Sequence, residues 1–265
     1  MLANINLLMA LAASSLVSAS PIASTLTPAT TTTNAAEAAV STSTSTGFQL
    51  VADVTDPFNA LALLVQNMAL QVYHAGANYR VPMLHKPDAQ NPGRVFFFDQ
   101  PPQNSSSVLL TDSFSDDTPS NSTTNPSISF GLVVQSPTDF IVPEYPHGAW
   151  FFAGSADATP VSLANTGTPY GGLFLLNEQG SGTFMACNRT IPYYNQEYGI
   201  TLEYLYDSDA LSSDEAPVVP GNCVPIRLVL VCADLPAVPP GSQSSHANAQ
   251  PVSCYTDMSG EQLSV

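Results

Sequence analysis

Positive charge is the scarcest property of this chain. Its 265 residues include 5 Lys and Arg against 21 Asp and Glu, which gives a formal net charge of −16. A surface of that sign repels phosphate backbones and anionic lipid headgroups. We therefore expect no nucleic-acid partner. Charged residues make up 10% of the chain, where roughly 25% is usual in globular proteins.

Metal-binding and nucleophile motifs are absent as well. No two cysteines have the close spacing of a zinc site, and there is no Gly-x-Ser-x-Gly turn. His74, His85 and His147 are scattered along the chain and are expected to be core or turn histidines. The sequence thus predicts no metal and no cofactor.

A glycosidase would need two opposed carboxylates. Glu203 and Asp207 should share one strand face, but four residues at ~3.3 Å each place them about 13 Å apart. Inverting enzymes hold the two groups ~6.5–9.5 Å apart. Glu144 or Glu178 could pair with either, so a carboxylate-based glycoside hydrolase remains an alternative. We expect no catalytic residues and a protein that is not an enzyme.

No apolar run reaches the ~18 residues that span a bilayer, so no transmembrane segment is expected. The first nineteen residues, "MLANINLLMALAASSLVSA", combine an apolar stretch with a small-residue cleavage pattern ending at Ala19. We predict a signal peptide at 1–19 and a secreted protein, extracellular or in a cell wall. Residues 20–46 are rich in Ser and Thr and contain no aromatic residue before Phe48, which predicts a disordered, glycosylated spacer.

Short apolar runs separated by Gly, Pro, Asn, Asp and Ser fill the rest of the chain. In "FQLVADV", residues 48–54, alternate residues are apolar, as in a half-buried strand. The pattern predicts an all-β domain over 47–235, an antiparallel β-sandwich or partly closed barrel. The runs "FFF" at 96–98 and "WFF" at 150–152 are expected in its core. An irregular Pro/Ser-rich tail, 236–265, should follow.

Three local features carry more specific expectations. Pro57 should begin one short helix, over 57–66, with Phe58, Leu61, Leu64 and Val65 on one face. Pro82 cannot donate to a ladder, so its strand should lie at an edge. The stretch "NEQGSG", 177–182, is typical of a hairpin loop with Gly180 or Gly182 at positive φ.

The four cysteines are Cys187, Cys223, Cys232 and Cys254, an even number in a chain expected to be exported. We favour disulfides Cys187–Cys223 and Cys232–Cys254, with Cys187–Cys232 as the alternative. The second bridge would tether the tail.

Three Asn-x-Ser/Thr triplets are candidate glycosylation sites, at Asn104, Asn121 and Asn188. The first two lie in expected loops. Asn188 directly follows Cys187, so the chain should leave the sheet there to expose it.

The stretch "MALQVYHAGANYRVPML" resembles a segment of small secreted fungal proteins that share an uncharacterised β-domain. The later order of "GTFMAC", "YGITLEYLY" and "CVPIRLVL" is similar to that family and, more distantly, to phialide-type fungal cell-wall proteins. The resemblance covers residues 47–235. It implies a secreted β-domain and brings no activity or catalytic residue with it.

A tyrosine cluster is the strongest sign of ligand binding. Tyr193, Tyr194 and Tyr198 should offer flat apolar faces with a hydroxyl, which suit sugar rings; strand packing is the alternative. We predict a non-catalytic secreted glycoprotein with a surface-interaction or adhesion role. The alternative is a carbohydrate-binding or host-interacting factor, with cell-wall polysaccharide or other surface glycans as partners.

Overall fold

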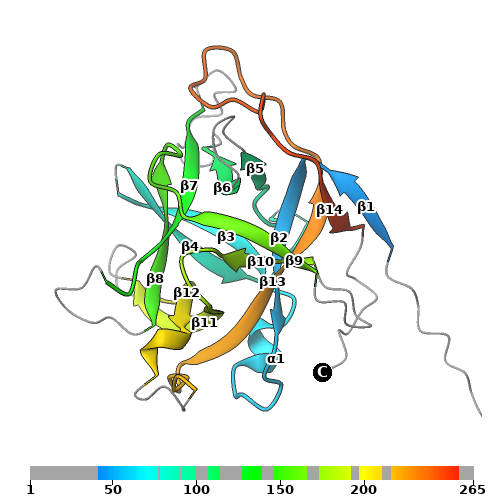
Figure 1. The fold of residues 1–265 in the computed structure, drawn as a ribbon. Helices are drawn as coiled ribbons and strands as arrows, with labels where there is room; N and C mark the ends of the chain where they lie inside the picture. The colour runs from blue at the N-terminus through cyan, green and yellow to red at the C-terminus, as the bar shows by residue number, and fades with distance from the viewer. Residues whose placement is uncertain are drawn as a thin grey trace, which may run out of the picture. The chain divides into compact units, whose positions relative to one another are not determined.

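The computed structural model describes most of the chain from Ser41 to Thr256, and Figure 1 shows its fold. The described residues are 41–76, 78–89, 91–99, 107–113, 127–138, 146–165, 173–191, 197–210 and 216–256. The predicted signal peptide, the spacer up to residue 40, Asn104, Asn121, Glu144, Tyr193 and Tyr194 lie outside these residues.

The described chain is nearly all β, as predicted, with one short helix α1 (Ala62–Val65) and a 3-10 turn at Asp207–Asp209. No helix in these residues has the length and apolar character needed to cross a membrane. The strands are β1 (Thr42–Ser45), β2 (Gly47–Val54), β3 (Ala69–Gly76), β4 (Tyr79–His85), β5 (Phe97–Asp99), β6 (Ser107–Asp112), β7 (Ser129–Val134), β8 (His147–Ala153), β9 (Pro160–Asn165), β10 (Leu173–Asn177), β11 (Gly182–Ile191), β12 (Glu197–Tyr206), β13 (Cys223–Ala233) and β14 (Val252–Tyr255).

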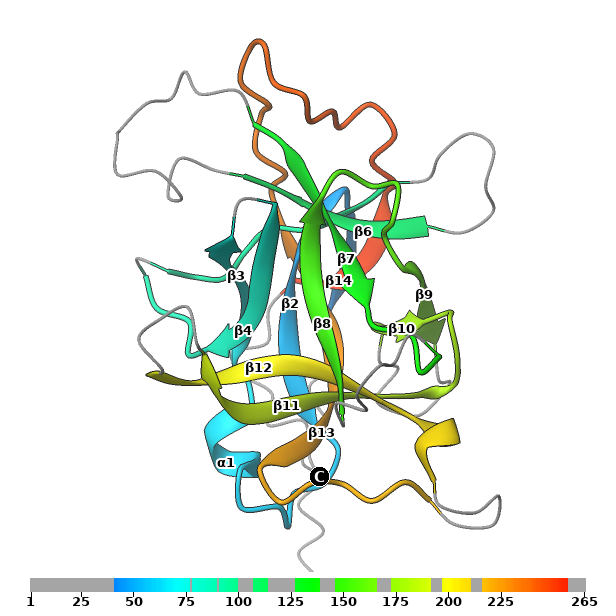
Figure 2. The same cartoon turned by 90° about the vertical axis from the view of Figure 1, so that its left-hand side faces the viewer.

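The strands form one connected sheet in the order β1-β14-β13-β10-β9-β6-β7-β8-β12-β4-β3-β2. Because β13 also pairs with β2, and β8 with β4, the pairings close into a ring. The strand pairs are antiparallel except for β13 with β14. β11 and β12 form a long hairpin that runs across the ends of β4 and β8 (Figure 2).

The core follows the two-residue alternation that the sequence predicts. Phe48, Leu50, Ala52 and Val54 of β2 are all buried inside the ring, and the "FFF" run at 96–98 is buried throughout. "WFF" is only partly a core segment: Phe151 is buried, whereas Trp150 is half-buried and Phe152 is exposed. Adjacent residues of a strand point to opposite faces, so a run of three aromatics is buried throughout only where both faces are covered. This holds at 96–98, where Phe97 packs in a second cluster with Val108 and Leu110.

Both ends of the described chain are more regular than the sequence predicts. β1 lies within the expected spacer and pairs with β14, which lies within the expected irregular tail. The pairing of Ser43 with Cys254 joins these two segments, and the Cys232–Cys254 disulfide attaches them to β13. β1 consists of Ser and Thr alone, whereas Cys254 and Tyr255 of β14 are buried, so the tethered tail supplies the partner for β1.

The one predicted helix is present within 57–66, but its length, most of its buried face and the hairpin loop were predicted wrongly. Phe58 and Leu63 are each 97% exposed, and the side chains that α1 buries are Ala62 and Val65. The helix is only four residues long because the preceding turns are held by side-chain caps from Asp56 and Asn59. β10 pairs with β9 and β13 instead of forming a hairpin with β11, and Gly180 and Gly182 do not have positive φ.

Candidate ligand-binding site at the junction of β4, β8 and β12

Three strands meet where β4 parts from β8. Tyr79 and Arg80 of β4 pair with β8, whereas Met83 and Leu84 pair with β12. The same stretch of β12 continues along β8, where Glu203 pairs with Gly148. At this junction the pairings among the three strands leave out residues 81–82 of β4, 149–150 of β8 and 202 of β12. The sheet therefore opens at this point.

Pro82 lies in this opening, which corrects the prediction that its strand is an edge strand. β4 is internal and pairs with β3, β8 and β12. Pro82 pairs with Val72 of β3, and no register assigns it a partner on its other side. A residue without an N–H is tolerated there because that side of the ladder is open.

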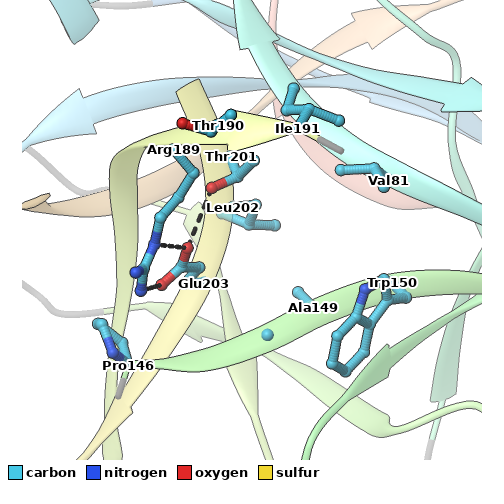
Figure 3. Close-up of a pocket in the computed structure, with 11 residues that line it drawn as sticks. Val81, Pro146, Ala149, Trp150, Arg189, Thr190, Ile191, Thr201, Leu202 and Glu203 are labelled. Carbon is cyan, nitrogen blue, oxygen red and sulfur yellow. Dashed lines mark hydrogen bonds and ion pairs between the residues drawn. The ribbon is translucent and has the colours of Figure 1, made fainter. Parts of the chain in front are cut away.

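The opening holds a cavity of about 370 Å³ on the outer face of the sheet (Figure 3). One wall carries the indole of Trp150, and the opposite wall carries the side chains of Arg189 and Glu203. Its lining is mostly apolar with four charged or hydroxyl side chains, and consists of Val81, Pro146, Gly148, Ala149, Trp150, Arg189, Thr190, Ile191, Thr201, Leu202 and Glu203.

Arg189 and Glu203 form a two-point ion pair across the β11–β12 hairpin. Arg189 Nε donates to Glu203 Oε1 at 2.8 Å, and Nη2 donates to Oε2 at 2.7 Å. The Glu203 side chain is 8% exposed and that of Arg189 is 38% exposed. Thr201 Oγ1 lies 3.1 Å from Glu203 Oε1 and 3.2 Å from the carbonyl oxygen of Cys187. The carboxylate is therefore fixed from two sides and its charge is neutralised.

Trp150 lies over Gly148. A Cβ at position 148 would lie 2.5 Å from both Cη2 and Cζ2 of the indole, so glycine is the one residue that leaves room for the ring. Gly148 is directly opposite Glu203 in the β8–β12 register. The flat apolar ring and the carboxylate are thus placed on neighbouring strands across one cavity.

The Cys187–Cys223 disulfide lies behind the polar wall. The two residues are opposite each other on β11 and β13, with Cα atoms 4.0 Å apart, and they form a small outer cluster with Met185 and Leu205. Both Sγ atoms and a Glu203 oxygen lie within 4.8 Å of one another. This is the one group in the described chain with metal-ligand spacing, and its two sulfurs are bonded to each other. A disulfide offers no thiolate, so the group does not fit a metal ion.

Several residues singled out in the sequence lie elsewhere. Tyr198 is 78% exposed but does not line the cavity, because strand alternation places it on the face of β12 opposite Thr201 and Glu203. Asp207 follows the end of β12 in an exposed turn, so it does not share a strand face with Glu203 as predicted. Glu178 is exposed and also outside the cavity.

The predicted exposure of Asn188 is confirmed, but the reason given for it was wrong. The residue is exposed although it remains in β11, where it pairs with Ile200. Both disulfides have the favoured pairing, Cys187–Cys223 and Cys232–Cys254. Among the histidines, His147 is buried and binds Asp209 at 3.0 Å.

Each of the four arginines contacts another side chain of the fold, and Arg80 and Arg94 are buried. Lys86 is exposed, and the sequence contains no Lys or Arg outside the described residues. Arg80 lies over the ring of Phe130, Arg94 binds Thr111 and Asp112, Arg189 binds Glu203, and Arg227 binds Asp53.

The comparisons with known proteins support the resemblance to fungal proteins. A curated relative, antigenic protein SchS34 of Stachybotrys chartarum, is 29% identical over 220 residues, which are 82% of this chain and 89% of the relative. No solved structure matches the chain. The family model for a domain of unknown function, DUF7907, matches residues 45–232, nearly the whole described sheet. The chain therefore belongs to the DUF7907 family.

Proposed function

We propose that this protein is an exported, non-catalytic binding protein that takes a sugar unit of a surface glycan into the cavity between Trp150 and Glu203. The observation that carries the proposal is the pairing of a half-buried indole with a fixed, neutralised carboxylate on opposite walls of one cavity.

A sugar ring matches both walls. One face of the ring presents C–H groups, which pack against the flat surface of an indole. The ring's hydroxyl groups need acceptors and donors. Arg189 occupies two of the roughly four acceptor positions of the Glu203 carboxylate and Thr201 at most one, so one remains for a ligand hydroxyl.

The charge of the site favours a neutral ligand. The Arg189–Glu203 pair has no net charge, so it offers no full ionic attraction to a cation or an anion. Anionic ligands are in addition repelled by the net charge of −16. A neutral polyhydroxylated ligand needs no ionic partner in the cavity and is not repelled by the net charge of the protein.

The acid-base groups among the described lining residues support binding without turnover. Glu203 is the one carboxylate among the described residues that line the cavity, and it is held by Arg189. Two-carboxylate glycoside hydrolysis requires a second acid opposite the first. The predicted signal peptide, the two disulfides and a relative named as an antigen support export to the extracellular space or cell wall.

The test uses the single tryptophan of the chain as a built-in probe. Secreted protein is screened on an array of neutral and anionic fungal and plant glycans, and hits are titrated in solution by Trp150 fluorescence. We expect saturable binding of neutral glycans, with the bound sugar recovered uncleaved.

Two variants and one control locate the site. Glu203→Gln removes the charge and Trp150→Phe removes the indole while keeping a ring; each should weaken binding on the array by tenfold or more. Leu63→Ser alters a side chain on α1 that is 97% exposed and outside the cavity, so it should bind as the wild type does. Binding unchanged in both site variants, or cleavage of the bound glycan, would show that the proposal is wrong.

A further inference from the structure

The cavity continues into a row of aromatic residues on the same outer face of the sheet. Strand alternation places Trp150 and Phe152 of β8 on one face, ~6.6 Å apart along the strand at ~3.3 Å per residue. Phe152 pairs directly with Tyr79 of β4, and their ring centroids are 6.1 Å apart. Tyr79 is 37% exposed and Phe152 is 39% exposed.

Val81 connects the two parts of the row. It lines the cavity and lies two residues from Tyr79 on β4, on the same face of that strand. On its other side it pairs with the half-buried Tyr73 of β3. The aromatic row, defined by Trp150, Phe152 and Tyr79 with Val81 between them, therefore begins at the cavity and leads away from it along β4 and β8.

The row is suited to an extended ligand more than to a single ring. Phe152 and Tyr79 do not line the cavity, yet they expose flat apolar surface that water does not solvate well. Phe152 and Tyr79 carry no charge, and the charges of Arg189 and Glu203 compensate each other. The row and the cavity together therefore favour a neutral ligand.

We infer that the protein binds a linear, neutral oligosaccharide of at least two or three units, with one unit in the Trp150–Glu203 cavity and the next stacked on Phe152 and Tyr79. This inference rests on the proposed function and adds the length and direction of the ligand. The ring pair would act as a second subsite, which strengthens binding of chains and leaves binding of the single unit unchanged.

The experiment compares ligand lengths in two proteins. The monosaccharide, disaccharide and tetrasaccharide of a neutral glycan that binds on the array are titrated against Trp150 fluorescence in the wild type and in the double variant Tyr79→Ala/Phe152→Ala. Circular dichroism and thermal unfolding confirm that the variant is folded, which its partly exposed positions make attainable. Leu63→Ser serves again as the matched surface control.

We expect the wild type to bind the tetrasaccharide about three- to tenfold more tightly than the monosaccharide, the range for one added aromatic stacking contact. The double variant should lose that gain while its affinity for the monosaccharide stays within twofold of the wild type. Equal affinity for all lengths in the wild type would overturn the second subsite but leave the cavity as a sugar site.

Two other results would also overturn the inference. If no sugar of any length binds, the proposed function fails and the subsite fails with it. If length has no effect and the wild type self-associates in sedimentation experiments while the double variant stays monomeric, the row is an interface between two copies of the chain.

Discussion

Gly148 lies directly opposite Glu203 in the β8–β12 ladder and directly beneath the indole of Trp150. Arg189 and Thr201 hold the carboxylate, and this glycine leaves the space that the indole occupies beside it.

The change Gly148→Ala should therefore displace Trp150 and weaken glycan binding by tenfold or more. The new Cβ would lie 2.5 Å from two indole carbons, so the ring must rotate away. The unfolding free energy should fall by about 1–3 kcal/mol, as for other overpacked sites. Gly221→Ala is the control, because a Cβ there meets no atom within 4 Å. Unchanged tryptophan emission and binding in Gly148→Ala would contradict this account.

Removal of Arg189 should cost more stability than removal of both members of its ion pair. Arg189→Leu leaves the buried Glu203 carboxylate without its partner, at a cost of about 3 kcal/mol for breaking such a pair. Arg189→Leu/Glu203→Leu removes both charges and should recover most of that loss. Urea unfolding of the four proteins in the double-mutant cycle measures the coupling. Additive effects would mean that the two side chains do not interact in solution.

The Cys187–Cys223 disulfide should stabilise the polar wall from behind. We expect Cys187→Ser to lower the unfolding free energy by about 2–5 kcal/mol and to reduce the secreted yield. Cys223 should become a free thiol while Cys232–Cys254 stays intact, because the second bridge is formed elsewhere, between β13 and β14. Peptide mapping under non-reducing conditions decides this; a new bridge between Cys223 and either remaining cysteine would refute it.

Alkaline pH should destabilise the fold through Tyr204. Burial raises the pKa of its hydroxyl above the ordinary value of about 10, with Tyr206 and Asp207 adding to the effect. The unfolded chain then ionises first, so stability is complete below pH ~10 and declines as the pH rises from there.

Tyr204→Phe should reduce this decline, as followed by urea midpoints between pH 8 and pH 11.5. The decline should not vanish, because burial also raises the pKa of Tyr73. At neutral pH the variant should be less stable, by about 1 kcal/mol, because the carbonyl of Gly180 loses the hydrogen bond that Tyr204 donates. A slope identical to that of the wild type would rule out Tyr204 as a source.

Asn188 should carry a glycan in secreted protein. Its side chain is exposed, and Thr190 completes an accessible triplet on the same face of β11. Asn188→Gln should lower the mass by one N-glycan, whereas Thr190→Ser keeps the triplet and should keep the mass. Mass spectrometry before and after enzymatic deglycosylation makes the comparison. An unmodified Asn188 in the wild type would contradict the expectation.

The strands and disulfides could be predicted from the sequence because each depends on local or pairwise information. The alternation in "FQLVADV" reports which residues of β2 face the core, and an even number of cysteines in an exported chain favours pairing. The closure of the sheet into a ring could not be derived in this way. It depends on β2 pairing with β13, about 170 residues farther along the chain.

The cavity was missed for a related reason. Trp150 was assigned to the core with its neighbours, and Glu203 was considered only as one of two opposed carboxylates of a glycosidase. The first assignment follows the usual behaviour of its residue type. Only the junction of three strands reveals that both face one opening. The sequence did contain one sign of the ion pair. Arg189 and Glu203 both lie inside apolar strand patterns of a chain with only 5 basic residues, and a buried charge needs a partner.

The pairing of the arginines has a consequence for how the folded protein resists proteases. Proteases of the trypsin class need a Lys or Arg side chain that can enter an acidic pocket. In this fold Lys86 is exposed but is followed by Pro87, Arg189 and Arg227 are held by ion pairs within strands, and no segment outside the described residues contains another Lys or Arg. The folded chain therefore presents almost no cleavage site to these enzymes. Because Lys86 is the single lysine of the sequence, amine-directed labels will attach only there and at the amino terminus.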